Sequence, residues 1–199
     1  YTKVCPSLTF EAPHTHGWMA GLEGGVPRIG FVSAFFHDHT IAILNKCLFD
    51  GLPRARFDLF IFSFSKVEDA WSEEFKSGKQ NFISLSKNLA EARQKIAEAE
   101  LDILYFTDIG MEPLTYFLGF SRLAPVQCVS WGHPVTTGLP NIDYFISSQL
   151  IEPENAAESY SERLLKLEGL PSCVLKPTEF KNIFKQERSN GQLIVCPQS

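Results

Sequence analysis

A chain of 199 residues with a 44% apolar share, including 17 Phe, can bury about 70% of its unfolded surface in one large α/β domain. The formal net charge of −5 and the lack of any apolar run near the roughly 18 residues of a membrane helix give no reason to expect nucleic acid or a membrane as partner. Five scattered cysteines, none in a Cys-x-x-Cys pair, predict neither a disulfide framework nor a zinc knuckle, so we expect a reducing, cytoplasmic setting.

Residues 1–27 are predicted to be an irregular lead-in, because prolines and glycines interrupt them and no hydrophobic period is sustained. The first predicted strand runs from Ile29 to Phe36 and is apolar enough to be buried on both faces. Thr40 is the expected N-cap of the helix that follows, in which apolar residues recur at helical spacing.

Strands and helices then alternate along the chain. Further strands are predicted at 57–64, 81–85, 101–106, 126–131 and 142–148, with an apolar run at 164–167. Helices are predicted at 68–76 and 86–100, from Pro113 onward, and at 152–161. With right-handed crossovers, this alternation predicts a doubly wound, Rossmann-like parallel sheet in an α/β lobe over residues 28–175.

Residues 176–199 are expected to connect this lobe to a second one. The stretch from Lys176 to Asn190 is polar, whereas Leu193 to Pro197 is typical of the opening of a new strand after the Asn190-Gly191 turn. We therefore expect the chain to be a fragment of a longer protein.

Three loops that follow the first, fourth and fifth predicted strands hold the candidate functional residues. The carboxyl ends of parallel strands meet at one edge of a doubly wound sheet, where such proteins bind ligands. These loops offer imidazoles, hydroxyls and glycines at which a backbone N–H can approach a phosphate or a sugar. The candidates are His39 as catalytic residue and, for binding donor or acceptor, Asp108, Gly110, His133, Pro134, Thr136, Thr137 and Gly138.

His39 stands next to a predicted helix N-terminus, whose dipole lowers the pKa of an imidazole. The ring then stays neutral near pH 7, which is the form that a general base needs. Each candidate also has a plain structural alternative: His39 as a capping residue, Asp108 as the cap of the next helix, and Thr136 to Gly138 as an ordinary turn.

A zinc hydrolase is a further alternative, because His14-x-His16 and His37-x-His39 each supply two imidazoles. Neither pair continues into a His-Glu-x-x-His helix or a comparable zinc motif, which weakens that hypothesis. Gly-x-Gly-x-x-Gly and P-loop signatures are also absent from the sequence, so a nicotinamide dehydrogenase or an ATPase loses its main support.

Several blocks between Arg28 and Pro171 resemble one enzyme family. They are Arg-Ile-Gly-Phe-Val-Ser-Ala-Phe-Phe-His-Asp-His-Thr from Arg28, Leu-Ala-Pro-Val-Gln-Cys-Val-Ser-Trp-Gly-His-Pro-Val-Thr-Thr-Gly from Leu123, Ile-Asp-Tyr-Phe-Ile-Ser-Ser from Ile142, and Tyr-Ser-Glu-Arg-Leu from Tyr160. In this order they resemble the O-GlcNAc transferase / SPINDLY family of glycosyltransferases, in its bacterial branch.

The resemblance implies the amino-terminal lobe of a two-lobed GT-B enzyme, often found behind tetratricopeptide helices. Such an enzyme transfers a sugar from a nucleotide sugar, here expected to be UDP-GlcNAc, to Ser or Thr of a protein or peptide acceptor. It works with inversion and without a metal or other cofactor. Most nucleotide contacts come from the second lobe, so this chain alone is expected to be inactive. Two alternatives stay open: a protein glucosyltransferase directed at Asn, and a non-catalytic interaction module that keeps the fold.

Residue by residue, His39 matches a family histidine implied to be a base or a contact on the sugar side. Two neighbours depart from the pattern, since Thr40 stands where many relatives have Pro and Phe35 where an acidic residue is frequent. His133-Pro134 with Thr136-Thr137-Gly138 matches a loop that lies beside the donor sugar and diphosphate. Some relatives have Tyr in place of His133, so a catalytic role for that residue is not required.

Overall fold

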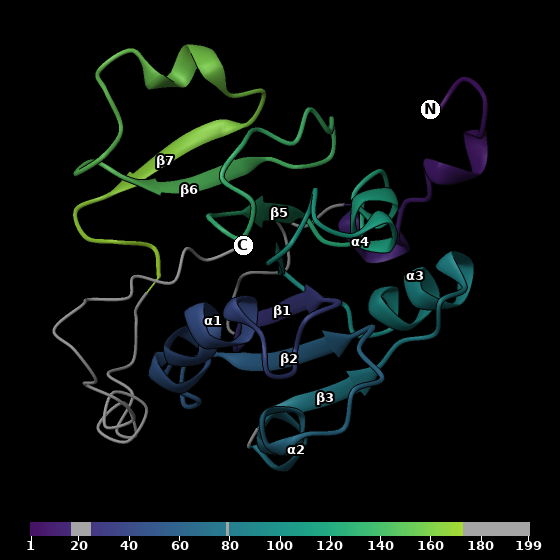
Figure 1. The fold of residues 1–199 in the computed structure, drawn as a ribbon. Coiled ribbons are helices and arrows are strands. Elements are labelled where there is room, and N and C mark those ends of the chain that lie inside the picture. The colour runs from purple at the N-terminus through teal and green to yellow at the C-terminus, as the bar shows by residue number, and fades with distance from the viewer. Residues whose placement is uncertain (17–24, 79, 173–199) are drawn as a thin grey trace, which may run out of the picture.

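The structure is a computed structural model that describes residues 1–16, 25–78 and 80–172. Its core is a seven-stranded parallel sheet in the order β3-β2-β1-β4-β5-β6-β7 (Figure 1). The strands are β1 Arg28–Ser33, β2 Asp58–Ser63, β3 Asn81–Ser84, β4 Ile103–Phe106, β5 Val126–Val129, β6 Tyr144–Ser148 and β7 Arg163–Leu167. The prediction of a doubly wound parallel sheet is confirmed, whereas the predicted connection and strand within 176–199 lie outside the described residues.

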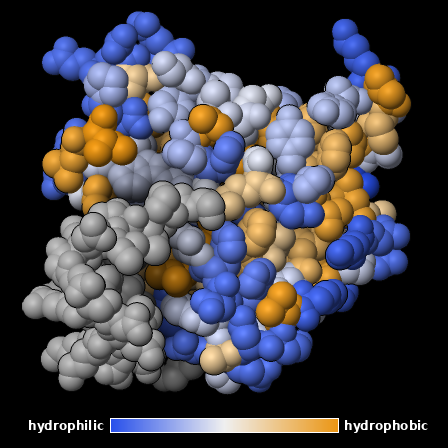
Figure 2. Space-filling model, viewed as in Figure 1, coloured by the Kyte–Doolittle hydropathy of each residue, from blue (hydrophilic) through white to orange (hydrophobic). Residues whose placement is uncertain are grey.

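Helices lie on both faces of the sheet. They are α1 Thr40–Gly51, α2 Ala70–Ser77, α3 Leu89–Ala97 and α4 Pro113–Leu118, with short 3-10 helices η1 Pro6–Leu8, η2 Pro13–Thr15 and η4 Ala156–Ser159. One core lies under α1 and α2 and includes Phe49 and Phe75, and the other lies under α3 and α4 and includes Ile96 and Leu118. The outward surface around α2 is largely hydrophilic, as expected for an amphipathic helix (Figure 2).

The order of the strands shows where the chain reverses its direction across the sheet. The chain builds outward from β1 to β3, returns through α3 to β4 on the other side of β1, and then builds outward to β7. The switch point therefore lies between β1 and β4, and the carboxyl ends of these strands flank the crevice at which doubly wound folds bind ligands.

Several predicted boundaries are wrong in the structure. The first strand ends at Ser33 rather than Phe36, because Ala34 and Phe35 turn away to bond with side chains rather than with a strand. Thr40 is the first residue of α1, and the N-cap is His39, whose side chain accepts the backbone N–H of Ile41.

The helix predicted over 152–161 is reduced to the short η4 helix. Two ties hold this segment in an irregular path. The Glu152 carboxylate accepts hydrogen bonds from Ser147 Oγ at 2.7 Å and from the Tyr160 hydroxyl at 2.8 Å. The ring of Tyr160 also packs on that of Phe145, with centroids 4.7 Å apart. These tertiary contacts outweigh the local helical tendency of the sequence.

Within the described ranges, no helix combines the length and apolar character that crossing a bilayer requires.

Candidate functional site

The loops after β1, β4 and β5 meet at the switch point. A Cβ added at Gly132, in the loop after β5, falls 1.6 Å from the carbonyl oxygen of Thr107, at the end of β4, and 3.2 Å from Ile41 in α1. A Cβ added at Gly110 falls 2.4 Å from the His133 ring. Only glycine fits at these two contacts, and the two glycines let the three loops approach one another closely.

Asp108 connects the loop after β4 to the loop after β1. Its Oδ2 accepts the backbone N–H of Ala34 at 2.9 Å and the hydroxyl of Ser33 at 3.3 Å, and Ser33 Oγ in turn accepts the backbone N–H of Phe35 at 2.9 Å. Asp108 does not cap the following helix, because Glu112 performs that role with bonds to the first turn of α4. The carboxylate therefore fixes the shape of the turn that carries the histidines.

Burial makes Asp108 an unusual carboxyl group. Its side chain is fully buried, and Oδ1 has no hydrogen-bond partner in the described part of the chain. Burial raises the pKa of Asp108 to about 7, although the bond from Ala34 N–H works in the opposite direction. A raised pKa at the edge of a crevice is a common property of functional carboxyls and also of structural ones.

His39 is held by its own helix. Its Nδ1 accepts the backbone N–H of Ile41 at 3.2 Å, and its ring stacks on Phe35 with centroids 4.4 Å apart. Since a neutral imidazole carries one proton, the proton of His39 is then on Nε2. Nε2 is therefore a hydrogen-bond donor in this arrangement. It offers a lone pair only if the ring loses the hydrogen bond from the Ile41 N–H to Nδ1.

The pKa of His39 is lowered, as the sequence predicted, but the main cause differs from the predicted helix dipole. Burial contributes most, the neighbouring His37 ring adds to it, and Asp38 acts in the opposite direction. The centroids of the two histidine rings are 5.9 Å apart. His39 is therefore neutral near pH 7, which suits a hydrogen-bonding contact with a substrate oxygen.

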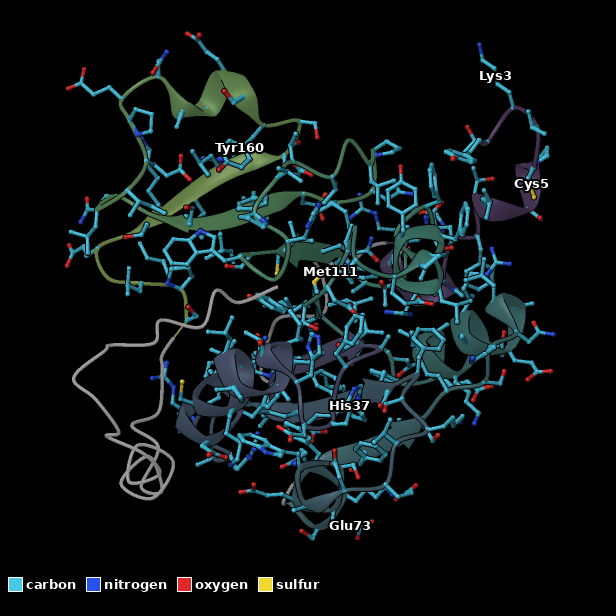
Figure 3. The ribbon with its side chains drawn as sticks, viewed as in Figure 1. Lys3, Cys5, His37, Glu73, Met111 and Tyr160 are labelled. Atoms are coloured by element: carbon cyan, nitrogen blue, oxygen red, sulfur yellow. The ribbon has the colours of Figure 1, made fainter. Side chains whose placement is uncertain are left out.

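His37 is tied to the neighbouring strand end. Its Nδ1 lies 2.8 Å from Ser65 Oγ, in the segment after β2, and the backbone N–H of Asp38 donates to Asp69 at 2.8 Å. Asp69 is also the N-cap of α2. His37 and Met111, labelled in Figure 3, mark the loops after β1 and β4. These bonds hold His37 in place between the segments that follow β1 and β2.

Glu162 and Ser161 hold the Thr136-Thr137-Gly138 loop through hydrogen bonds. The carboxylate of Glu162 accepts bonds from Thr136 Oγ1 at 2.7 Å and from the backbone N–H of Thr137 at 2.7 Å, and it also accepts the Thr137 hydroxyl. Ser161 Oγ accepts the N–H of Gly138 at 3.1 Å and lies 2.8 Å from Thr136 Oγ1. The two threonine hydroxyls therefore hold the loop to Ser161 and Glu162, directly before β7.

Glu162, which the sequence analysis does not single out, is the residue that holds this loop in place. It is buried, and although burial alone raises the pKa of a carboxyl, the hydrogen bonds from Thr137 and Thr136 bring the net pKa of Glu162 below its ordinary value. The Tyr-Ser-Glu-Arg-Leu block was visible in the sequence, but nothing in it indicated a partner 25 residues away.

A second polar network backs the loop after β5. Trp131 Nε1 donates to Ser147 Oγ at 3.0 Å, and Ser147 and Tyr160 both donate to Glu152. Burial together with the Glu152 carboxylate raises the pKa of Tyr160 to about 12, so the hydroxyl remains a donor. Next to it, a shallow pocket of about 240 Å³ is lined by Pro134, Val135, Thr136, Glu152, Pro153, Ala156, Ser159 and Tyr160.

The two His-x-His pairs do not come together. His14 Nε2 lies 3.2 Å from the Leu101 carbonyl, before the start of β4, whereas His37 and His39 follow the end of β1. In a parallel sheet these positions are at opposite edges. The described residues contain no group of three His, Cys, Asp or Glu side chains placed to hold a metal ion. The hypothesis of a zinc site made from both pairs is therefore wrong.

Comparison with known proteins shows the family of this chain. The family model described as glycosyl transferase family 41 matches residues 4–171. The chain belongs to this family. The match includes most of the lead-in, in which we had found no distinctive motif. A mutant O-GlcNAc transferase of Thermobaculum terrenum has a similar fold, with a TM-score of 0.68 at 23% identity over 77% of this chain and 30% of that chain.

Two curated relatives of this family 41 chain show different chemistry in their names. A probable UDP-N-acetylglucosamine–peptide N-acetylglucosaminyltransferase SEC of Arabidopsis thaliana is 28% identical over 94% of this chain. A UDP-glucose:protein N-beta-glucosyltransferase of Actinobacillus pleuropneumoniae is 40% identical over 33% of this chain. The chain spans 19% of the first relative and 10% of the second.

Proposed function

We propose that this chain is the amino-terminal lobe of a glycosyltransferase that moves N-acetylglucosamine from UDP-GlcNAc to Ser or Thr of a protein acceptor, with inversion and without a metal. The observation that carries the proposal is the family 41 match over 4–171, which contains all three loops that meet at the switch point. In this proposal residues 28–175 form the lobe, and residues 176–199 lead into a second lobe of the same chain.

The geometry of His39 favours one of the two roles that the family resemblance implies. A general base needs a lone pair on the nitrogen that faces the substrate, but the cap on Nδ1 places the proton on Nε2. We therefore assign His39 to a contact with an oxygen of the sugar or of the acceptor, with Nε2–H as donor. Burial and stacking on Phe35 hold the ring for that contact.

Other groups of the site are proposed to stabilise the negative charge that the reaction develops. Negative charge builds up on the leaving diphosphate as the sugar–oxygen bond breaks, and backbone N–H groups at a helix N-terminus can meet it. The N-terminus of α1 opens at the crevice directly after His39. His133 and Gly110 bring a second loop to the same place. Basic groups from the second lobe must supply the remaining stabilisation, so this lobe alone is expected to be inactive.

An Asn-directed glucosyltransferase is the second candidate. The 40% identity over 65 residues to the Actinobacillus enzyme is higher than the identity to the Arabidopsis protein, although over a shorter stretch. Both candidates use the same lobe and differ in donor sugar and acceptor atom.

The test uses full-length protein with UDP-GlcNAc, UDP-glucose and GDP-fucose in turn and a cell lysate as acceptor. Transfer of N-acetylglucosamine to Ser or Thr, located by peptide mass spectrometry, supports the leading proposal. Transfer of glucose to Asn supports the second candidate instead. Folded protein that transfers none of the three sugars would contradict both candidates and favour a non-catalytic interaction module that keeps the fold.

A further inference from the structure

The shallow pocket between the loop after β5 and the η4 segment lies directly beside the crevice. Its lining begins at Pro134, which follows His133, and the His133 ring lies against Gly110 in the loop after β4. The Cα atoms of the lining residues Pro134 to Thr136 lie within roughly 11 Å of that of His133, because at most three residues separate them. An extended peptide rises about 3.4 Å per residue, so a polypeptide with one residue in the crevice can place another in the pocket.

The size of the pocket suits a single side chain. Sites that hold whole small-molecule ligands usually have volumes of about 300–1,000 Å³, whereas this pocket has about 240 Å³. It is open to solvent, since Val135 in its lining is 52% exposed. A residue that projects from a polypeptide can enter such a pocket, but a nucleotide sugar is too large for it.

The pocket has apolar walls around one carboxylate. The walls include Pro134, Val135, Pro153, Ala156 and Tyr160. The carboxylate is that of Glu152, and within the described part of the chain both hydrogen bonds that it accepts, from the Ser147 and Tyr160 hydroxyls, end at Oε1. Ser147 Oγ also accepts the Trp131 Nε1–H, so one network fixes the carboxylate and backs the loop after β5. Oε2 is left for a ligand.

The charge around the pocket selects the kind of side chain. The stretch from Glu152 to Glu162 contains four Glu and no Lys or Arg. Lys166 on β7 reaches the same region, where its ammonium donates to the Pro153 carbonyl at 3.0 Å. A diphosphate is repelled by the Glu152 carboxylate, whereas a cation is attracted to it. The side chains of lysine and arginine can lay an apolar stem along apolar walls and bring a charged end to a carboxylate.

We propose that this pocket binds a basic side chain, Lys or Arg, of the protein acceptor, within about four positions of the residue that receives the sugar. The inference rests on the proposed glycosyltransferase function, since an acceptor polypeptide is the substrate that passes the crevice and the pocket together. It identifies the acceptors by their chemistry, as polypeptides with a basic residue close to the modified one.

The first experiment measures binding without turnover. Full-length protein carries the diazirine analogue of leucine in place of Val135 and is irradiated with short Gly/Ala peptides that contain one Ser and one Lys, the Lys being scanned along both sides of the Ser. Each peptide has a partner with norleucine, an uncharged apolar side chain, in place of Lys. We expect at least one Lys peptide to crosslink about fivefold more than its partner, as a partly exposed ion pair supports. Equal yields at every position, or folded protein with no crosslink to any peptide, would overturn the proposal.

Two variants separate the ion pair from the rest of the pocket. Gln at position 152 keeps an Oε1 that accepts the Ser147 and Tyr160 hydroxyls but carries no charge. Glu152→Gln should therefore keep the free energy of unfolding and lose the preference for Lys over norleucine. Glu154→Gln removes the same charge from an exposed residue that does not line the pocket, and it should keep the preference. A preference retained in Glu152→Gln, or lost equally in both variants, would contradict the assignment.

Sugar transfer to the same peptides tests the inference together with the proposed function. We expect kcat/KM for the preferred Lys peptide to exceed that for its norleucine partner about fivefold in the wild type, and the two values to be equal in Glu152→Gln. A binding preference without any transfer would contradict the proposed function and support the pocket assignment. Transfer that is indifferent to the basic residue would support the function and overturn the pocket assignment.

Discussion

His39 has two roles that one pair of substitutions separates. Asn at this position still accepts the Ile41 N–H as an N-cap, but it does not place a donor where Nε2–H lies. We expect His39→Asn to keep the stability of the protein and to lower its sugar-transfer rate at least about tenfold, a loss typical of removing a directed contact in the transition state. His39→Ala should lower the rate similarly and also cost about 1 kcal/mol through loss of the cap.

The sugar-transfer rate and the free energy of unfolding, measured on both variants, check this prediction. An unchanged transfer rate in His39→Asn would show that the histidine only caps α1.

Asp108 makes stability depend on pH. Burial raises the pKa of Asp108 to about 7 in the folded state, well above the ordinary value of about 3.9 for an aspartate, so the folded protein binds the proton more tightly than the unfolded chain. The stabilisation of the folded state by proton binding at Asp108 is complete below about pH 4. It is lost as the pH rises toward and through 7. The shift corresponds to roughly 4 kcal/mol at most.

Asp108→Asn resembles the protonated form and should remove this part of the pH dependence. The free energy of unfolding, measured by denaturant titration at pH 5 and pH 8, should therefore fall less between the two values in the variant than in the wild type. Equal losses would show that Asp108 opens to solvent or keeps an ordinary pKa.

At the scale of elements, the Glu162 carboxylate fastens the Thr136-Thr137 loop to the start of β7. Glu162→Ala leaves the hydroxyls and N–H of that loop without their acceptor, which costs about 1–3 kcal/mol. We expect faster amide hydrogen exchange at residues 134–139. Glu158→Ala removes an exposed carboxylate from η4 nearby and is the matched control, for which exchange should not change. Equal protection of the loop in both variants would rule out the fastening role.

The elements themselves were readable from the sequence because their signals are local. Apolar runs and helical periods gave the order of strands and helices, and the order gave the edge at which the three loops meet. The contacts that shape the site are not local. Asp108 bonds with Ala34 across 74 positions, and Glu162 bonds with Thr137 across 25. No periodicity reports such pairs, so the sequence leaves open whether Thr136 to Gly138 contact a ligand or form an ordinary turn.

The same limit explains the boundary errors. A Ser-Ala-Phe-Phe stretch continues a strand by propensity, but Asp108 takes the N–H of Ala34 out of the ladder. Glu152 and Tyr160 bind each other across the segment that was expected to be a helix. In each case a tertiary hydrogen bond decides the backbone path where the local preference is weak.

At the scale of the whole molecule, the described part of the lead-in, residues 1–16, packs against the lobe. Leu8 is buried against the core under α3 and α4, its carbonyl accepts the Ser121 hydroxyl at 3.2 Å, and Ala12 N–H donates to the Arg122 carbonyl at 2.8 Å. Arg93 on α3 also donates to the Ser7 carbonyl at 2.5 Å. These bonds join the first residues to two helical connections that are distant in sequence.

Leu8→Ala tests whether the lobe depends on this segment. Removing a buried leucine side chain typically costs about 2–3 kcal/mol when the site can partly collapse, as expected near a chain end. Val4→Ala is the control, because Val4 is 91% exposed and its loss should change the free energy of unfolding by no more than about 0.5 kcal/mol. Denaturant unfolding of both variants measures the difference. Equal small effects would mean that the stability of the lobe does not depend on this segment, whereas the expected gap would show that Leu8 contributes to it.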